Sequence, residues 1–228
     1  MLVFLASAGA KKPEILMETF YACESRDFTQ DILLTDKREG ITYDFAIQRG
    51  MEVIVISDVS FQNFDWEDYD LDVGNAILVS CGWPYLIPEK VFSKFKAALN
   101  CHGSYLPDYR GSRAYMHYWA NCSDYYGASI HYINKNFDDG NILVRAKQKL
   151  FMTDDKDVVF YRTAELCGII LSKAISMVKE NHPGYEYDEV KRYFFKMAPE
   201  EFVEHRKMNE KRIMQGYDIL LTRHKVLE

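Results

Sequence analysis

Residues 97–111 read Ala-Ala-Leu-Asn-Cys-His-Gly-Ser-Tyr-Leu-Pro-Asp-Tyr-Arg-Gly, an apolar run that passes into polar residues and then into a turn rich in Pro and Gly. The apolar beginning predicts the carboxyl end of a buried strand. Side chains two positions apart on a strand share a face, so we expect Asn100 and His102 to point into one crevice and Cys101 to point the other way. An amide and an imidazole at a strand end indicate a candidate active site.

Short aliphatic runs recur before this stretch and are separated by segments with helical spacing. Continuous apolar strands alternating with helices are typical of a parallel sheet that is covered on both faces. We therefore expect an α/β fold with a doubly wound, Rossmann-like, mostly parallel sheet flanked by helices over about residues 1–110. The expected strands lie at residues 2–6, 31–35, 52–57, 76–80 and 97–102. Ligands bind at the carboxyl ends of such strands, which places residues 7–12, 81–88 and 100–111 along one edge.

The second half of the chain predicts two more strands, at residues 127–133 and 141–150, joined by the acidic turn 134–140. Asp155 and its neighbours are suited to capping a long helix that ends before Pro183. Its expected apolar stripe consists of Val158, Tyr161, Ala164, Ile169, Leu171, Ile175 and Val178. We expect a catalytic domain over residues 1–184 and a short C-terminal appendage of helical and aromatic character over residues 185–228, with a helix at about 199–215.

Composition limits the classes of partner. The 228 residues carry a net charge of −6, so the sequence lacks the basic field that nucleic-acid phosphates require, and we expect no nucleic-acid partner. Five dispersed cysteines without a C-x-x-C pair predict a reducing compartment, no disulfide framework and no four-thiolate zinc site, and we expect no metal-binding residues. The N-terminal apolar run is too short for a signal peptide or a membrane span, so we expect a cytoplasmic protein without a membrane contact. The acidic run 65–72 predicts a solvated loop.

A second chemical cluster follows at residues 127–142. Asp138 and Asp139 lie in the turn between the two later strands, and either carboxylate could face Asn100 and His102. His, Asn and Asp together suit acyl transfer to an amine, because His and Asn donate hydrogen bonds to an oxyanion and Asp stabilises an imidazolium. His131 lies inside a predicted strand, where a structural role is expected, and Asp139 is expected to be a solvated turn residue.

Three ordered motifs lie between Asn100 and Ile142, namely N-x-H-x-S-x-L-P-x-Y-R-G, G-x-S-x-H and D-x-G-x-I. Together they resemble the formyltransferases that use 10-formyltetrahydrofolate, most closely those that act on nucleotide sugars. The resemblance implies that Asn100, His102 and Asp138 are catalytic, because the D-x-G-x-I register selects Asp138 over Asp139. Ser129 stands where many relatives have Thr, and the hydroxyl is retained.

The resemblance also implies where the substrates bind. The co-substrate 10-formyltetrahydrofolate is expected against the loop 81–88 and the opposite wall 134–138, with contacts from Trp83, Tyr85, Leu86, Ile87, Asn134 and Phe137. An apolar loop with free backbone groups suits a flat heterocycle. Trp83 and Tyr85 are equally compatible with ordinary core aromatics. For the acceptor, the expected binding residues are Lys11, Lys12, Ser104, Tyr109 and Arg110, where Arg110 suits either an anionic substrate group or a turn.

The first loop ranks the acceptors that the family implies. Residues 7–12 read Ser-Ala-Gly-Ala-Lys-Lys, with one glycine and two lysines, whereas a glycine-rich phosphate cradle is expected for glycinamide ribonucleotide. The tRNA-specific relatives carry a larger C-terminal domain. A nucleotide-linked amino sugar is therefore the leading acceptor, glycinamide ribonucleotide is the alternative, and a homodimer is expected.

Other enzyme classes fit less well. A formyltetrahydrofolate hydrolase or a zinc-assisted amide hydrolase could use His102, His131 and Asp138, but the sequence has no H-E-x-x-H motif or cysteine pair. A serine hydrolase lacks the G-x-S-x-G elbow. A binding module without activity would leave the polar groups near Asn100 unexplained.

Overall fold

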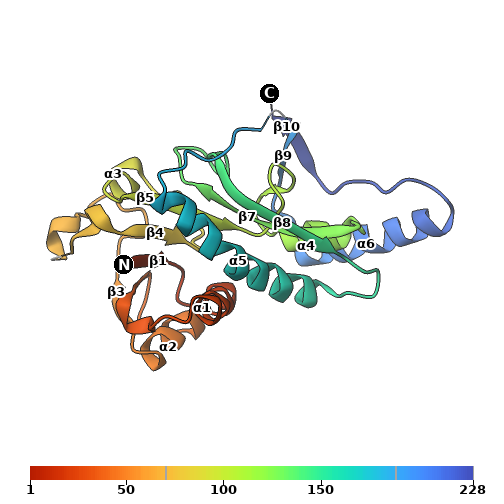
Figure 1. Ribbon diagram of the computed structural model, residues 1–228. Coiled ribbons are helices and arrows are strands. Elements are labelled where there is room, and N and C mark those ends of the chain that lie inside the picture. The colour runs from red at the N-terminus through yellow and green to blue at the C-terminus, as the bar shows by residue number, and fades with distance from the viewer. Residues whose placement is uncertain (70, 188, 228) are drawn as a thin grey trace.

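The computed structural model describes residues 1–69, 71–187 and 189–227, and a seven-stranded sheet in the order β3-β2-β1-β4-β5-β7-β8 forms its centre (Figure 1). The first five strands in this order are parallel to one another. Strand β7 is antiparallel to β5, and β8 is antiparallel to β7. The strands are β1 (Leu2–Leu5), β2 (Ile32–Thr35), β3 (Glu52–Val55), β4 (Ile77–Ser80), β5 (Ala97–His102), β7 (Tyr125–Tyr132) and β8 (Ile142–Lys149). The predicted strands and the mostly parallel α/β fold are confirmed.

Three helices cover one face of the sheet. They are α1 (Lys11–Glu24), α2 (Ile41–Gln48) and α5 (Lys156–Lys179), and α5 packs beside α1 (Figure 1). Alternate side chains of each strand point to this face, as Leu2 and Phe4 of β1 do. Val3 and Leu5 point to the opposite face. This alternation gives the sheet two apolar faces, and each must be covered.

The second face is covered mainly by loops and short helices. The short helices on this face are η2 (Trp66–Asp68), η3 (Val73–Asn75) and α3 (Glu89–Phe92). Another short helix, η1 (Phe28–Gln30), precedes β2 and is not part of this cover. The acidic run 65–72 was expected to be solvated, and this is wrong for Trp66, which is buried with its indole N–H donating to the Val91 carbonyl. Asp70 lies outside the described residues. Aromatic side chains fill here the space that a helix would occupy.

The long helix is confirmed, with Asp155 accepting hydrogen bonds from two backbone amides at its N-terminus. Its predicted apolar stripe is partly wrong, because Ile169 is 51% exposed and Val158 lies at the edge of the buried face. The buried face instead includes Val159, Cys167 and Ile170. Successive residues of an α-helix are about 100° apart around its axis. A predicted stripe that is shifted by one residue therefore faces away from the sheet.

The C-terminal segment packs against the rest of the chain (Figure 1). Its strands β9 (Lys191–Phe194) and β10 (His224–Leu227) form a second sheet with β6 (Arg110–Gly111), which immediately follows the β5 motif. Its helix α6 (Pro199–Met214) packs on α4 (Ala114–Ala120), where Phe202 belongs to one buried cluster with Met116 and Ala120. The segment predicted as an appendage is therefore joined to the strand that follows the candidate active site.

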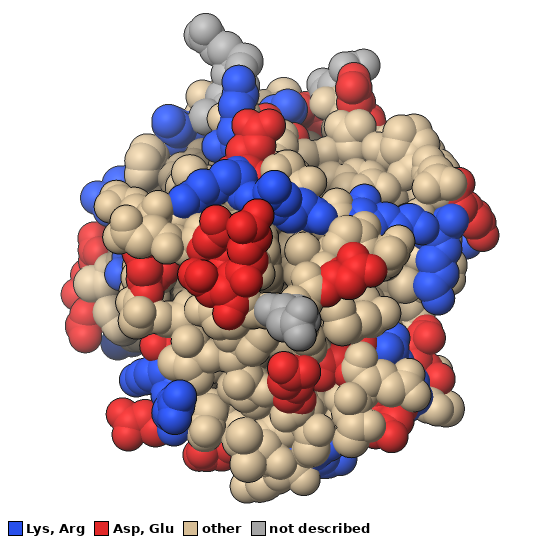
Figure 2. All heavy atoms as spheres, turned by 90° about the vertical axis from the view of Figure 1, so that its left-hand side faces the viewer, with Lys and Arg blue, Asp and Glu red and all other residues tan. Residues whose placement is uncertain are grey.

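Charged side chains of both signs lie on the surface. Figure 2 shows basic and acidic side chains interspersed on the face that it presents. Among the described helices, none is both long and apolar enough to span a bilayer.

We expect Phe202→Ala to lower the free energy of unfolding by about 3 kcal/mol, because removing a fully buried aromatic ring leaves a cavity between α4 and α6. Urea unfolding monitored by circular dichroism measures this change. Val203→Ala, at the neighbouring and partly exposed position, is the control and should change stability by less than about 1 kcal/mol. An equally small effect of Phe202→Ala would contradict the packing of the C-terminal segment on the core.

Candidate active site

The polar groups of the opening motif meet at the carboxyl end of β5. Asn100 and His102 share one face of the strand as predicted, and Cys101 points into the opposite core with α5. The neighbouring strand β7 places His131 directly opposite Asn100, and Ser129 opposite His102. The Ser129 hydroxyl donates to the Ser104 carbonyl and accepts from the Leu106 amide. This hydroxyl therefore fixes the loop that follows β5.

The turn between β7 and β8 brings Asp138 to the same place. Its backbone lies in the left-handed region with a φ of 48°, which is uncommon for a residue with a side chain. The nearby Gly140 passes so close to Tyr132 that a Cβ atom would overlap the Tyr132 carbonyl oxygen. Only glycine allows this close approach, and the tight turn directs the Asp138 carboxylate back over the end of β5.

Four groups surround the Asp138 carboxylate. Oδ1 accepts a hydrogen bond from Asn100 Nδ2 at 3.2 Å and lies 3.4 Å from His102 Nδ1. Oδ2 accepts from the Gly111 amide at 3.0 Å. His131 Nε2 lies 3.8 Å from Oδ1 and 3.1 Å from Asn100 Nδ2. The three residues that the motifs selected thus lie within contact of one another, together with His131.

Burial and charge set the protonation states of His102 and Asp138. Burial lowers the pKa of His102 below its usual value, and the Asp138 carboxylate opposes this shift only in part. Burial by itself raises the pKa of Asp138, but the two histidine rings and the Gly111 amide outweigh it and hold that pKa well below the usual range. At neutral pH the site therefore contains a neutral imidazole beside a carboxylate.

Two cavities meet at this carboxylate. The larger, of about 420 Å³, is lined by His102 and also by Lys12, Arg113, Tyr115 and Tyr193. The smaller, of about 90 Å³, is lined by the loop after β4 and by the turn after β7. Both cavities share four lining residues, which are Trp83, Asn100, Phe137 and Asp138. The candidate triad therefore lies where two ligands would touch.

All six residues expected to bind the co-substrate line the smaller cavity, namely Trp83, Tyr85, Leu86, Ile87, Asn134 and Phe137. Tyr85, Leu86 and Phe137 are each about half exposed, although they are apolar or aromatic. The buried indole Nε1 of Trp83 has no hydrogen-bond partner among the described residues. An apolar wall with an unused donor suits a flat heterocycle with polar edges.

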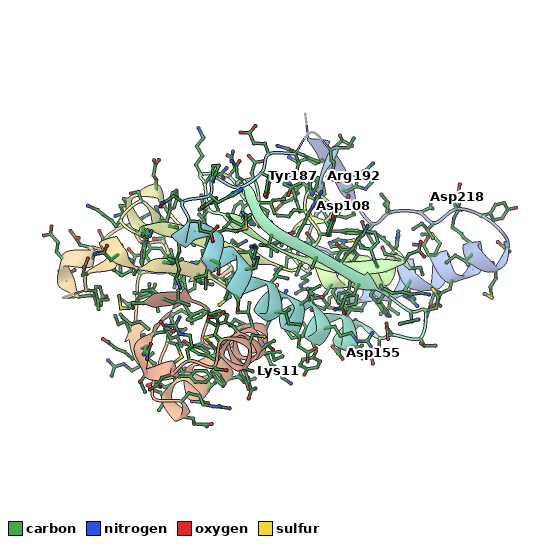
Figure 3. All side chains as sticks on the ribbon, viewed as in Figure 1. Lys11, Asp108, Asp155, Tyr187, Arg192 and Asp218 are labelled. Carbon is green, nitrogen blue, oxygen red and sulfur yellow. The ribbon has the colours of Figure 1, made fainter. Side chains whose placement is uncertain are left out.

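Of the five residues expected to bind the acceptor, the structure brings only Lys12 to the larger cavity. Lys11 contacts Tyr161 of α5, and Figure 3 shows it far from Tyr187 and Arg192 of the C-terminal segment. Ser104 and Tyr109 are buried, where Ser104 donates to the Asp108 carbonyl and Tyr109 stacks on Phe194. Arg110 is buried as well and pairs with Asp139. None of these four side chains lines the larger cavity. Ser104, Tyr109 and Arg110 instead make contacts that hold the loop after β5 in place.

Several residues of the site were not anticipated. His131 was expected to be a hydrogen-bonded structural residue, and the structure places it against Asn100, to which it lies opposite across the antiparallel pair. Asp139 was expected to be solvated, but it accepts from Arg110, Asn136 and Lys191. Ser112, Arg113, Tyr115 and Tyr193 line the larger cavity. No local sequence signal marks Tyr193, because it reaches the site through the pairing of β9 with β6.

The arrangement is suited to acyl transfer between two bound molecules. It offers an amide donor, an imidazole able to take a proton, and an ionised carboxylate to stabilise the resulting cation. Across residues 1–69, 71–187 and 189–227, no group of three or more His, Cys, Asp or Glu side chains could hold a metal ion. These described residues therefore do not supply the zinc ligands that the zinc-hydrolase alternative would need.

Comparisons with known proteins bear on the same segment. A family model described as formyl transferase matches residues 62–175, half of the chain, and this range contains all three motifs. The methionyl-tRNA formyltransferase of Ligilactobacillus salivarius (strain UCC118) is 28% identical over 173 residues, or 75% of this chain and 54% of that protein. The GDP-perosamine N-formyltransferase of Brucella melitensis biotype 1 is 30% identical over 111 residues, or 48% of this chain and 42% of that protein. The chain thus spans about half the length of these relatives.

The fold likeness extends further along the chain. The N-formyltransferase from Helicobacter canadensis, solved in complex with folinic acid and dTDP-3-aminofucose, superimposes with a TM-score of 0.64 at 17% identity. The match covers 91% of this chain and 79% of that one, and at this identity it shows a shared fold. Together with the matched family model, these similarities show that the chain belongs to the formyl transferase family, whose enzymes use 10-formyltetrahydrofolate.

Proposed function

We propose that this chain transfers the formyl group of 10-formyltetrahydrofolate to the amine of a nucleotide-linked amino sugar. The observation that carries the proposal is the junction of two cavities at Asn100 and Asp138, one apolar and one with two cations. Family membership supports the reaction, and the lining of the larger cavity supports the acceptor class.

The smaller cavity suits the formyl donor. Its aromatic and aliphatic walls offer contact area to the pterin, and the unused indole donor of Trp83 offers a polar contact. His131 lines this cavity, whereas His102 lines the larger one. In this arrangement the donor's formyl group reaches the junction from one side, and the amine approaches His102 from the other.

The larger cavity suits an anionic acceptor with a flat base. Lys12 has no ion-pair or hydrogen-bond partner in the described part of the chain, and Arg113 makes only one long contact there, 3.4 Å to the Met197 carbonyl. Most other buried or half-buried cations, such as Arg110 and Arg206, already pair with carboxylates. Two unpaired cations in a cavity favour a phosphate group. Tyr115 and Tyr193 offer aromatic faces on which a base could stack.

The first loop disfavours phosphate binding by backbone amides. The Ala8 amide donates to the Asp36 carboxylate at 2.8 Å, and the Ala10 amide donates to the Ser7 carbonyl at 3.0 Å. Two of the donors that a phosphate cradle would need are thus occupied, and a carboxylate lies beside them. This supports a nucleotide sugar held by side chains over glycinamide ribonucleotide held by this loop.

In the proposed reaction the lone pair of the unprotonated amine attacks the formyl carbon, and a C–N bond forms as the carbonyl oxygen becomes an oxyanion. Asn100 donates to that oxygen and gives up one of its present contacts. His102 takes the proton that the amine releases, and the resulting imidazolium is stabilised by Asp138 and serves as a second donor. The bond from the formyl carbon to N10 of the folate then breaks, and N10 leaves with the electron pair and accepts the proton.

A second acceptor is favoured by a separate observation. The similarity to the methionyl-tRNA formyltransferase of L. salivarius spans three quarters of this chain, so the amine of methionyl-tRNA is the second candidate. Its phosphates would need a broad basic surface, whereas charges of both signs are interspersed on the face in Figure 2. The acceptor assay below includes it.

We expect the purified protein to consume 10-formyltetrahydrofolate only when a nucleotide-linked amino sugar is present, with a formyl addition detected by mass spectrometry. Glycinamide ribonucleotide and methionyl-tRNA are the other acceptors of the panel. Asn100→Ala should lower kcat by about 10²-fold, because one oxyanion donor is lost. Formylation of methionyl-tRNA alone would overturn the acceptor, and free formate without any formylated amine would overturn the transfer reaction.

Removing either unpaired cation should weaken acceptor binding. We expect Lys12→Met and Arg113→Met each to raise the KM for the nucleotide sugar about tenfold, the loss of roughly one charge-assisted contact. The KM for 10-formyltetrahydrofolate should stay the same. Lys11→Met is the matched control, since Lys11 lies outside both cavities. Equal effects of Lys11→Met and Lys12→Met would count against a phosphate site at Lys12.

The His102–Asp138 pair gives a prediction that needs no substrate. Asp138→Asn removes the charge that opposes the effect of burial, so the pKa of His102 should fall further below its usual value. An NMR titration of the histidine ring protons measures it. Glu165→Gln, which removes an exposed carboxylate on α5, should leave that pKa unchanged. A pKa that rises or stays constant in Asp138→Asn would refute the pairing.

A further inference from the structure

We infer that Arg110 and Lys191 position the Asp138 carboxylate by clamping its neighbour Asp139, so that the C-terminal strand β9 holds the catalytic turn in place. The inference rests on the proposed function only in taking Asp138 as catalytic. It assigns Arg110 a positioning role, in place of the contact with substrate that the sequence suggested.

The clamp consists of three contacts to one carboxylate. Arg110 and Lys191 both reach Asp139 Oδ1, the lysine at 3.3 Å, and Asn136 Nδ2 donates to Oδ2 at 3.2 Å. The Arg110 side chain is only 6% exposed. A buried guanidinium that loses its carboxylate is left with an uncompensated charge, so this pair resists separation.

The turn needs such support because its backbone is held away from its preferred conformation. Asp138 has a positive φ, and such a residue persists where its surroundings fix it. Asp139 is adjacent in the chain, so the clamp on Asp139 restrains the backbone on one side of Asp138. The close approach of Gly140 to Tyr132 restrains the segment beyond it.

Strand β6 contacts both acidic residues. The Arg110 side chain binds Asp139, and the next residue, Gly111, donates its amide to Asp138. Strand β9 in turn pairs with β6, with Arg110 opposite Tyr193 and Gly111 opposite Phe194. The Phe194 ring stacks on the ring of Tyr109, the residue immediately before β6, with 4.5 Å between the ring centroids. The C-terminal segment thereby reaches the catalytic carboxylate through β6 and, by way of Lys191, through Asp139.

The geometry separates this role from substrate binding. Arg110 does not line the cavity that contains His102, whereas Gly111, Ser112 and Arg113 do. A substrate in that cavity would meet these neighbours, and the guanidinium lies behind them against Asp139. Loss of Arg110 should therefore misplace Asp138 and leave the acceptor contacts intact.

The test compares Arg110→Gln with wild type by NMR titration of His102 and by steady-state kinetics. If Arg110 positions Asp138, its loss moves that carboxylate away, so the pKa of His102 falls toward the value in Asp138→Asn. Simple removal of a nearby positive charge would raise that pKa, so the sign distinguishes the two roles. We expect kcat to fall at least tenfold, because small misplacements of catalytic groups are costly, and the KM for the acceptor to change less than twofold.

Three further variants complete the design. Arg110→Lys retains a charge for Asp139 and should recover part of kcat and of the His102 pKa. Lys191→Met, at a partly exposed position, should lower both kcat and the His102 pKa by a smaller amount. This variant replaces Arg110→Gln as the test if Arg110→Gln fails to fold. Arg162→Gln, which removes a surface ion pair with Asp154, is the control and should change neither readout.

A raised or unchanged His102 pKa in Arg110→Gln, or a raised acceptor KM with kcat intact, would overturn the positioning role. The NMR readout does not depend on turnover. If wild-type protein formylates no acceptor while the His102 pKa still falls in Arg110→Gln, then the proposed function fails and the clamp stands.

Discussion

The site depends on one constraint, which is that the Asp138 carboxylate is buried and must be satisfied by neighbouring groups. A carboxylate removed from water is costly unless hydrogen bonds and opposite charges replace the solvent. Strand β5 supplies Asn100 and His102, strand β6 supplies the Gly111 amide, and β7 brings His131 nearby. These partners come from three strands, β5, β6 and β7. The contacts that stabilise this carboxylate therefore also fix how these strands meet.

The distribution of cations follows from the same logic. Arg110 is enclosed against Asp139, and Arg206 bonds Glu210 together with the carbonyls of Trp119 and Met152. These arginines join segments that are distant in sequence. Lys12 and Arg113 line the cavity beside His102 and find no carboxylate in the part of the chain that the structure describes. This contrast between cations that pair with carboxylates and cations that do not is the physical basis for our proposal that the acceptor's phosphates bind in this cavity.

Much of the fold was predictable because its signals are local. Buried strands are apolar runs, and the turn residues between them are read from their types, so β1, β4, β5, β7 and α5 were located closely. The covering of the second sheet face was missed, since Trp66 lies within an acidic run whose average composition indicates solvent. At the site, strand spacing indicated Asn100 and His102, the family resemblance added Asp138, and the structure brings the three side chains together. Of the five side chains expected to bind the acceptor, only Lys12 lines the larger cavity. The sequence does not tell which way the side chains of Ser104, Tyr109 and Arg110 point, and all three are buried in the structure.

The sequence by itself determined the α/β class, the strand end that bears Asn100 and His102, and the family, because these depend on apolar periodicity and on ordered motifs. Only the tertiary structure decided which groups surround Asp138 and which line the cavities. Arg110 and Arg113 are three positions apart, yet one is enclosed against Asp139 and the other lines the larger cavity. Tyr193 pairs with Arg110 across β9 and β6, and Lys191 of β9 contacts Asp139, a residue 52 positions earlier in the chain. Such contacts arise from packing between distant segments, and no local pattern encodes them.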